Sequence, residues 1–202
     1  MKIKAIIFDL GGVVFHEDWH ALNRDMVKKY GISTLIRSQY DQEINNEYNK
    51  ATIGKSSMKK VFEKICSKKG IKININELCR YYAEHYKKHK KLNKNLIKLI
   101  KKLRRNYKIV CFTGTNAIHF KSHKEQGILN IFHKSFASHL VKGIKEEKRS
   151  FIIILKKLRM KPEETLFIDD YKPNIMTAKS IGIRTILFRN NKQLINDLKK
   201  QK

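Results

Sequence analysis

The chain has 202 residues, 41% of them hydrophobic, which is enough for one domain with a buried core, with or without a modest insertion. No apolar stretch approaches the roughly 20 residues that a membrane helix needs, and the N-terminus lacks the small-residue cleavage site of a secretory signal. The formal net charge of +27 attracts phosphorylated metabolites, nucleic acid or acidic membranes, although a genome-wide bias toward lysine would produce it without any ligand.

The first predicted element is a buried strand over residues 3–9, which ends in Asp9. The chain then turns through Gly11 and Gly12, within residues 10–16. A buried strand that ends in a carboxylate presents this group to the ligand crevice of an open α/β sheet. The glycines allow backbone amides to approach an anion closely.

Residues 17–90 are polar, rich in tyrosine and lysine, and helical in pattern. The clearest helix begins after Ser57, an N-cap residue, places apolar residues on one face and ends at Gly70. Only the short run 71–75 alternates as a strand would. The segment is therefore interpreted as a helical insertion that follows the first strand.

An amphipathic helix is predicted over residues 91–105, and strands and helices alternate after it. The predicted strands are 108–113, 135–138, 165–169 and 183–188, and the predicted helices are 116–127, 149–160, 173–181 and a terminal helix. This order predicts an α/β fold, with a Rossmann-like parallel sheet core, helices on both faces and an inserted α-helical cap.

Acidic residues end two of the predicted strands. Asp9 ends the first, and Asp169 and Asp170 end the strand at 165–169. Carboxylate oxygens are the ligands that Mg²⁺ prefers, so the three residues predict a hard-cation site. Taken alone, Asp9 also fits a turn residue, and the acidic pair also fits the start of the next helix, where it would stabilise the helix dipole.

The three cysteines, Cys66, Cys79 and Cys111, are odd in number and lack the paired spacing of a metal site. Cys111 lies inside the apolar run 109–112, where a free thiol packs as a small hydrophobic group. A reducing cytoplasm is therefore the expected location.

Four short motifs follow one another: Phe8-Asp9-Leu10-Gly11-Gly12-Val13, then Phe112-Thr113-Gly114-Thr115-Asn116, then a lysine, then Ile168-Asp169-Asp170 with Asn174 four residues later. In this order and spacing they resemble the haloacid dehalogenase-like hydrolase superfamily. The insertion resembles that family's small α-helical cap, and the first motif resembles its sugar-phosphatase-like branch. The resemblance implies a core domain of residues 1–16 and 91–202 and a cap domain of residues 17–90.

The resemblance also implies a Mg²⁺-dependent phosphatase that hydrolyses a small phosphorylated metabolite through an aspartyl-phosphate on Asp9. A covalent intermediate replaces one difficult displacement by two easier ones, and Mg²⁺ neutralises phosphate charge. The implied metal ligands are Asp9, Asp170, the backbone carbonyl of Gly11, and Asp169 or a water that it holds.

The implied phosphate contacts are the Thr113 hydroxyl, backbone amides from Gly114 onward and a lysine. Counting back from Asp169 at the usual family separation gives Lys145, with Lys148 as the alternative. Considered alone, Thr113 fits a helix N-cap equally well.

Three positions depart from the family pattern. Most phosphatases of the family carry a second Asp two residues after the nucleophile, which protonates the leaving group and then activates water, and this position is Gly11 here. Such general acid–base help is typically worth about 10² to 10⁴ in rate. His16 and His20 are candidates to replace it, because histidine titrates near neutral pH. The other departures are Gly114 in place of a common Asn and Glu146 in place of the usual Pro.

Two alternative functions stay open. A metal-independent haloacid dehalogenase-type hydrolase also lacks the second Asp, although it does not need the retained Asp169–Asp170 pair. A weakly active or inactive member could instead bind nucleic acid through the basic residues of 87–105, which follow Tyr81, Tyr82 and Tyr86. A small phosphorylated substrate is the favoured partner, nucleic acid is less favoured, and no membrane partner is expected.

Overall fold

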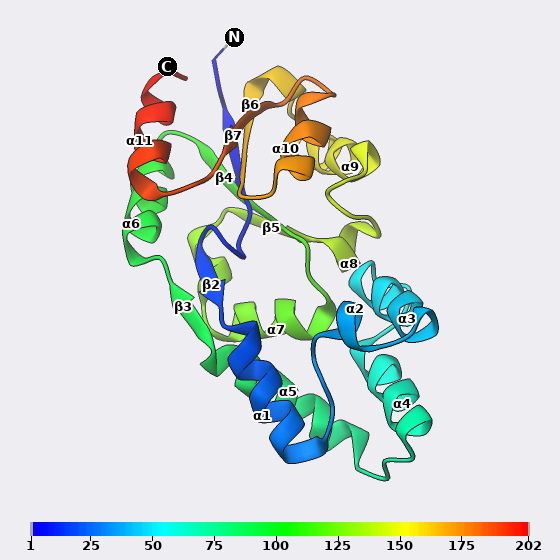
Figure 1. Cartoon of the computed structure of the whole chain (residues 1–202). Helices are drawn as coiled ribbons and strands as arrows, with labels where there is room; N and C mark the ends of the chain where they lie inside the picture. The colour runs from blue at the N-terminus through cyan, green and yellow to red at the C-terminus, as the bar shows by residue number, and fades with distance from the viewer. Residues whose placement is uncertain (1, 202) are drawn as a thin grey trace.

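A five-stranded parallel sheet forms the centre of the molecule (Figure 1), in a computed structural model that describes residues 2–201. The strand order is β5-β4-β1-β6-β7. The strands are β1 (Ala5–Phe8), β4 (Lys108–Thr113), β5 (Lys134–Ala137), β6 (Thr165–Asp169) and β7 (Arg184–Leu187). The predicted α/β fold with a parallel sheet is confirmed, and β4 and β6 have the predicted bounds.

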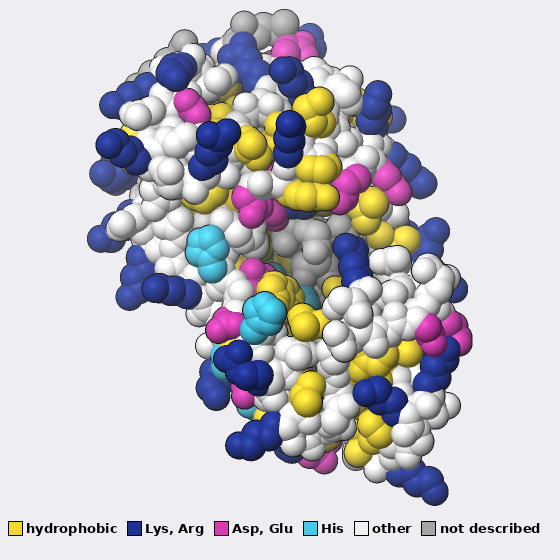
Figure 2. Space-filling model, in the orientation of Figure 1, with side chains coloured by type: hydrophobic (Ala, Val, Ile, Leu, Met, Phe, Trp, Pro, Cys, Tyr) yellow, Lys and Arg dark blue, Asp and Glu magenta, His cyan; other side chains and the backbone are white. Residues whose placement is uncertain are grey.

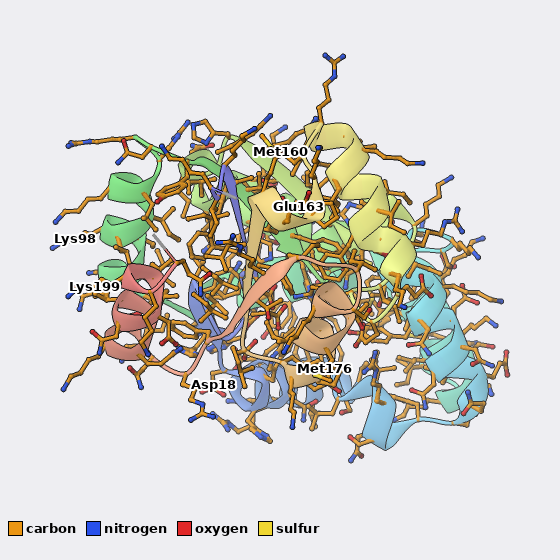
Figure 3. All side chains as sticks on the ribbon, turned by 90° about the horizontal axis from the view of Figure 1, so that it is seen from above. Asp18, Lys98, Met160, Glu163, Met176 and Lys199 are labelled. Carbon is orange, nitrogen blue, oxygen red and sulfur yellow. The ribbon has the colours of Figure 1, made fainter. Side chains whose placement is uncertain are left out.

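Helices cover both faces of this sheet. They are α6 (Lys94–Leu103) and α11 (Asn191–Lys199) on one face, and α9 (Lys148–Leu158) and α10 (Lys172–Lys179) on the other. Ile6 and Phe8 of β1 enter the first hydrophobic cluster and Ile7 enters the second, because successive side chains of a strand point to opposite faces. Figure 3 shows the two helix pairs on opposite sides, with Lys98 and Lys199 at the outer surface.

The strand register brings two acidic residues together. Phe8 of β1 pairs with Ile168 of β6, so the next residues, Asp9 and Asp169, follow at the same carboxyl edge of the sheet. The Asp9 amide donates a hydrogen bond to the Ile168 carbonyl at 2.9 Å, which extends the ladder by one residue. This edge is where open α/β sheets bind their ligands.

A short antiparallel pair, β2 (Phe15–Glu17) and β3 (Lys90–Leu92), forms where the chain leaves the sheet and where it returns. Three-residue strands are too short to show an alternating pattern, so the sequence predicts neither. The prediction of one helix over 91–105 is wrong at its start, because β3 occupies 90–92 and Asn93 caps α6 by accepting from the Leu96 amide.

The insertion between β2 and β3 is helical, and we call its five helices the cap helices. They are α1 (Trp19–Tyr30), α2 (Ile36–Gln39), α3 (Gln42–Thr52), α4 (Met58–Lys69) and α5 (Ile75–Lys88), and they share a hydrophobic cluster separate from the two on the sheet. The predicted helix after Ser57 is confirmed, since Ser57 accepts from the Lys60 amide and Gly70 ends the helix in a left-handed conformation. The division into domains at residues 17 and 90 stays a prediction.

The cap helices contact the sheet portion at two places. Ile118 of α7 (Ala117–Glu125) packs into the cap cluster beside α5. The turn after α3 lies against α8 (Ser138–Val141), where a Cβ on Gly54 would stand 2.3 Å from the His139 carbonyl oxygen. Two short 3₁₀ helices, Ile128–Ile131 and Pro162–Glu164, complete the described chain. Within residues 2–201 no helix combines the length and apolarity needed to cross a bilayer.

Phe151 of α9 tests the packing of the second sheet face. Its ring meets Phe112 and Phe167 edge-on at centroid distances of 5.5 and 5.0 Å, and the side chain is fully buried. Phe151→Ala should lower the free energy of unfolding by about 3–5 kcal/mol, because it removes these contacts and leaves a cavity. Urea denaturation measures the change, with Ile152→Ala as the control, since that neighbouring side chain is 42% exposed. Equal losses in the two variants would contradict the packing described here.

Candidate active site

Three carboxylates meet at the carboxyl edge of the sheet. Oxygen atoms of Asp9, Asp169 and Asp170 all lie within 4.8 Å of one another. Asp9 and Asp169 are buried and Asp170 is exposed. Oxygen ligands of one Mg²⁺ stand about 2.0–2.1 Å from the ion and hence at most about 4.2 Å from one another, so a small movement of these side chains would bring all three oxygens around such a cation.

Lys145 joins two of these carboxylates. Its ammonium lies 2.7 Å from Asp9 Oδ2 and 2.7 Å from Asp169 Oδ2, and the side chain is buried. Burial acts to lower the pKa of Lys145, but the charges of Asp9 and Asp169 outweigh it and raise this pKa. Lys148, the alternative predicted lysine, is exposed at the start of α9. The structure therefore brings Lys145 into the cluster.

Backbone and amide donors hold both buried carboxylates in place. Asp9 Oδ1 accepts from the Leu10 amide at 2.7 Å, and Asp169 Oδ1 accepts from the Tyr171 amide at 2.8 Å. Asn174 Nδ2 donates to both oxygens of Asp169, at 3.2 and 3.1 Å. Burial raises the pKa of Asp9, and the Asp169 charge adds to this rise while Lys145 opposes it. Asp9 Oδ1 is thus held by the backbone, and Oδ2 is paired with Lys145.

Gly12 makes room for Asp170. Its φ of +72° is a left-handed conformation that favours glycine, and a Cβ there would stand 1.9 Å from Asp170 Oδ2. From the sequence, we expect the two glycines to let backbone amides approach an anion closely. The structure gives Gly12 a different reason, since a larger residue would displace one of the three carboxylates.

Thr113 ends β4 and Gly114 follows it, on the other side of Asp9 from β6. Thr113 is buried at the strand end, and it is not the N-cap of α7, because Asn116 accepts from the His119 amide in that role. A Cβ on Gly114 would contact Lys145 Cε at 3.6 Å. The second predicted motif therefore lies directly beside the predicted lysine.

A cavity of about 290 Å³ opens from this edge toward the cap helices. Figure 2 shows the hollow between the two parts of the molecule, with acidic side chains on its upper rim. Besides Asp9, Thr113 and Lys145, it is lined from the cap side by Glu17, Trp19, Arg37, Tyr48, Thr52 and Tyr86. Their positions depend on how the cap helices pack, and no spacing in the sequence indicates them.

Ser138 also lines the cavity, and the sequence could have predicted this position. It directly follows β5, and the rule that a polar residue after a parallel strand lies at the ligand edge applies to it as well as to Asp9. Its hydroxyl is buried and has no hydrogen-bond partner among residues 2–201. By contrast, His16 and His20 are exposed and do not line the cavity.

A polar relay runs along the cap side of the cavity. Lys90 Nζ donates to His123 Nδ1 at 3.1 Å, which leaves His123 Nε2 facing the Tyr86 oxygen at 3.4 Å. The Tyr86 hydroxyl donates to Glu17 Oε1 at 3.2 Å. Burial raises the pKa of Glu17 to about 7 and lowers the pKa of Lys90 to about 8. Burial, with the Lys90 charge, lowers the pKa of His123 to about 3.

The family model described as haloacid dehalogenase-like hydrolase matches residues 6–188. The parallel sheet and the carboxylates at its edge agree with this match. The chain therefore belongs to the haloacid dehalogenase-like hydrolase family. The assignment to the sugar-phosphatase-like branch stays a prediction.

Solved structures share the fold over nearly the whole chain. A HAD family enzyme from Bacteroides thetaiotaomicron, bt-2542, superposes with a TM-score of 0.81 at 21% identity, covering 96% of this chain and 99% of that one. The same enzyme in complex with magnesium and inorganic phosphate gives 0.78 at 21% identity, with coverage of 95% and 98%. A 2-haloacid dehalogenase from Pseudomonas syringae gives 0.68 at 14% identity, with coverage of 92% and 86%.

Among curated proteins, bifunctional epoxide hydrolase 2 of Rattus norvegicus is 35% identical over 57 residues. This match covers 28% of the present chain and only 10% of the length of that relative. It is a local similarity, and the activities of the relative do not follow from it.

Burial of His123, with the nearby charge of Lys90, makes stability depend on pH. The unfolded state binds more protons between pH 3 and the ordinary histidine pKa of about 6.5, so stability falls as pH falls through this range. Between pH 7 and pH 5 the free energy of unfolding should fall in both proteins, but by about 1–2 kcal/mol less in His123→Gln than in the unchanged chain. Urea denaturation at both pH values measures this difference. His20→Gln is the exposed control and should lose as much as the unchanged chain; the same loss in His123→Gln would contradict the lowered pKa of His123.

Proposed function

We propose that this hydrolase is a Mg²⁺-dependent phosphatase that acts on a small phosphorylated metabolite through a phosphoryl group carried by Asp9. The observation that supports it best is the cluster at the sheet edge: three carboxylates within 4.8 Å of one another, with a buried ammonium 2.7 Å from two of them. A phosphate dianion needs cations around it, and an attacking carboxylate needs its charge balanced.

Each residue has a role in this proposal. Asp9 Oδ2 attacks phosphorus, since Oδ1 is held by the Leu10 amide. The Thr113 hydroxyl, the amides from Gly114 onward and the Lys145 ammonium bind the phosphoryl oxygens. Lys145 exchanges one carboxylate contact for this anion, so its charge stays paired throughout.

The carboxylate cluster would hold Mg²⁺ through Asp9, Asp170, the Gly11 carbonyl, and Asp169 or a water that it holds. Bound there, the ion would neutralise phosphoryl charge and reduce its repulsion of the nucleophile. The donor set is all oxygen, as Mg²⁺ requires. The structure of the bt-2542 enzyme in complex with magnesium and inorganic phosphate supports the same chemistry for a similar fold.

A carbon–halogen hydrolase is the second candidate, because 2-haloacid dehalogenases share the fold and Gly11 removes the second Asp of most phosphatases of the family. Halide release in the presence of EDTA would favour it. The third carboxylate, Asp170, favours the phosphatase, since Asp9 and Asp169 already pair with Lys145 and a reaction without metal needs no further acid beside them.

Nucleic-acid binding receives less support. Tyr82 and Tyr86, two of the three tyrosines proposed as a stacking surface, are only 3% and 2% exposed and pack among the cap helices and α7. Figure 2 shows lysine and arginine side chains spread over both parts of the visible face rather than gathered in one patch.

Asp9→Asn tests the nucleophile. With 4-nitrophenyl phosphate and Mg²⁺, turnover should fall by at least about 10³-fold, because an amide does not form the covalent intermediate. Asp197→Asn, on α11 and away from the sheet edge, is the matched control and should keep full turnover. Hydrolysis at the unchanged rate by Asp9→Asn would refute the proposal.

Gly12→Ala tests the metal site. The added Cβ must displace Asp170, so the Mg²⁺ concentration needed for half-maximal activity should rise at least tenfold, and EDTA should abolish activity of the unchanged chain. Gly70→Ala imposes the same left-handed backbone strain with nothing within 4 Å of the new Cβ. Titration calorimetry with Mg²⁺ compares the two variants directly, and equal Mg²⁺ affinities would exclude Asp170 as a ligand.

A further inference from the structure

Cleavage of an unactivated phosphate ester needs a proton for the leaving oxygen, and hydrolysis of the resulting aspartyl-phosphate needs a group that takes a proton from water. Asp9, Lys145 and the other two carboxylates are already assigned under the proposed function, on which this inference depends. A further group on the cap side of the cavity is therefore required.

Glu17 of β2 stands at the right place for this task. A Cβ built on Gly11, two residues after Asp9, would lie 3.3 Å from both carboxylate oxygens of Glu17. The Glu17 carboxylate thus occupies the space that a side chain at position 11 would enter. It also lines the same cavity as Asp9 and Thr113.

Its hydrogen bonding leaves one side of the carboxylate available. The Tyr86 hydroxyl is the one side-chain donor to Glu17 among residues 2–201, and it binds Oε1. Tyr86 is itself fixed by a ring stack on His119 at 3.8 Å and by the relay from Lys90 through His123. The carboxylate is therefore held by its Oε1 side.

The two histidines and the lysine of the cavity wall are engaged elsewhere. His119 Nε2 lies 2.7 Å from the Tyr82 hydroxyl, and its Nδ1 faces the Asn116 amide at 3.4 Å. His123 lies between Lys90 and Tyr86, and Lys145 between two carboxylates. Glu146 is the remaining acid in the wall, but it is exposed and follows Lys145 on the core side.

We infer that Glu17 is the general acid and then the general base of the phosphatase reaction, in place of the residue that Gly11 lacks. As Asp9 Oδ2 bonds to phosphorus and the ester P–O bond breaks, the Glu17 carboxyl gives its proton to the leaving oxygen, which departs as an alcohol. Water then attacks phosphorus and the Asp9–phosphorus bond breaks. The Glu17 carboxylate takes the proton from this water, so inorganic phosphate leaves and the protonated carboxyl is restored.

Glu17→Gln separates the two steps, since the amide keeps the shape and the Tyr86 contact. Steady-state turnover should fall by about 10² to 10⁴-fold with both phenyl phosphate and 4-nitrophenyl phosphate. With 4-nitrophenyl phosphate, a rapid burst of about one nitrophenolate per active site should remain, because this leaving group departs without a proton. With phenyl phosphate the burst should be lost. Glu84→Gln, which changes an exposed glutamate of α5 that does not line the cavity, should behave as the unchanged chain.

A rescue variant tests position rather than mere presence. Gly11 is not among the described glycines with a positive φ. Its backbone therefore accepts a side chain without strain. Glu17→Ala empties the space. The double variant Glu17→Ala with Gly11→Asp should turn over at least tenfold faster than Glu17→Ala alone, because the new carboxyl enters the same space. Folding of each variant is checked by its urea midpoint.

Turnover of Glu17→Gln within threefold of the unchanged chain would overturn the inference. So would a loss of turnover of about 10² to 10⁴-fold in Glu146→Gln instead of in Glu17→Gln. Equal loss of burst and steady state on both esters in a folded Glu17→Gln would also overturn it, because a purely structural role predicts that result. Each of these outcomes leaves the Asp9→Asn result intact, whereas failure of the proposed function removes the Asp9 dependence itself.

Discussion

A buried ammonium between two buried carboxylates is the interaction on which the site depends. Lys145 joins Asp9 at the end of β1 to Asp169 at the end of β6, at 2.7 Å in each case. Removing one partner of such a buried group costs about 3–5 kcal/mol, because it leaves an uncompensated charge. The strand register sets the spacing of the two carboxylates, and the loop before α9 delivers the cation. The arrangement is costly for stability and suited to binding an anion that competes for the lysine.

The cap helices complete the site rather than merely cover it. They bring Trp19, Tyr86 and Arg37 to the cavity, and the β2–β3 pair at their base carries Glu17 and Lys90. Their contact with the sheet portion is tight on both sides, through α7 and through α8. In the proposed reaction, selectivity and proton transfer would therefore depend on the same small set of packed aromatic and polar groups, and phosphoryl binding would depend on the sheet edge.

The sequence was sufficient to predict the parallel sheet and the acidic residues at its carboxyl edge. Long apolar runs and the acids that end them predict β4, β6 and the meeting of Asp9 with Asp169, because parallel strands share a carboxyl edge. The same reasoning could not find β2 and β3, which are too short for any periodicity. It also could not find Glu17, because that residue meets Gly11 only after the chain turns back on itself. It offered His16 and His20 as candidates instead, on their chemistry and without knowledge of their position.

The most direct measurement of the central claim is a crystal structure with Mg²⁺ and beryllium fluoride, which mimics a phosphoryl group on a carboxylate. We expect beryllium bonded to Asp9 Oδ2, a metal ion about 2.0–2.1 Å from oxygens of Asp9 and Asp170, and Lys145 and Thr113 in contact with the fluorides. A structure in which Asp9 keeps its present pairing with Lys145, with no metal ion and no fluoride at the sheet edge, would contradict it.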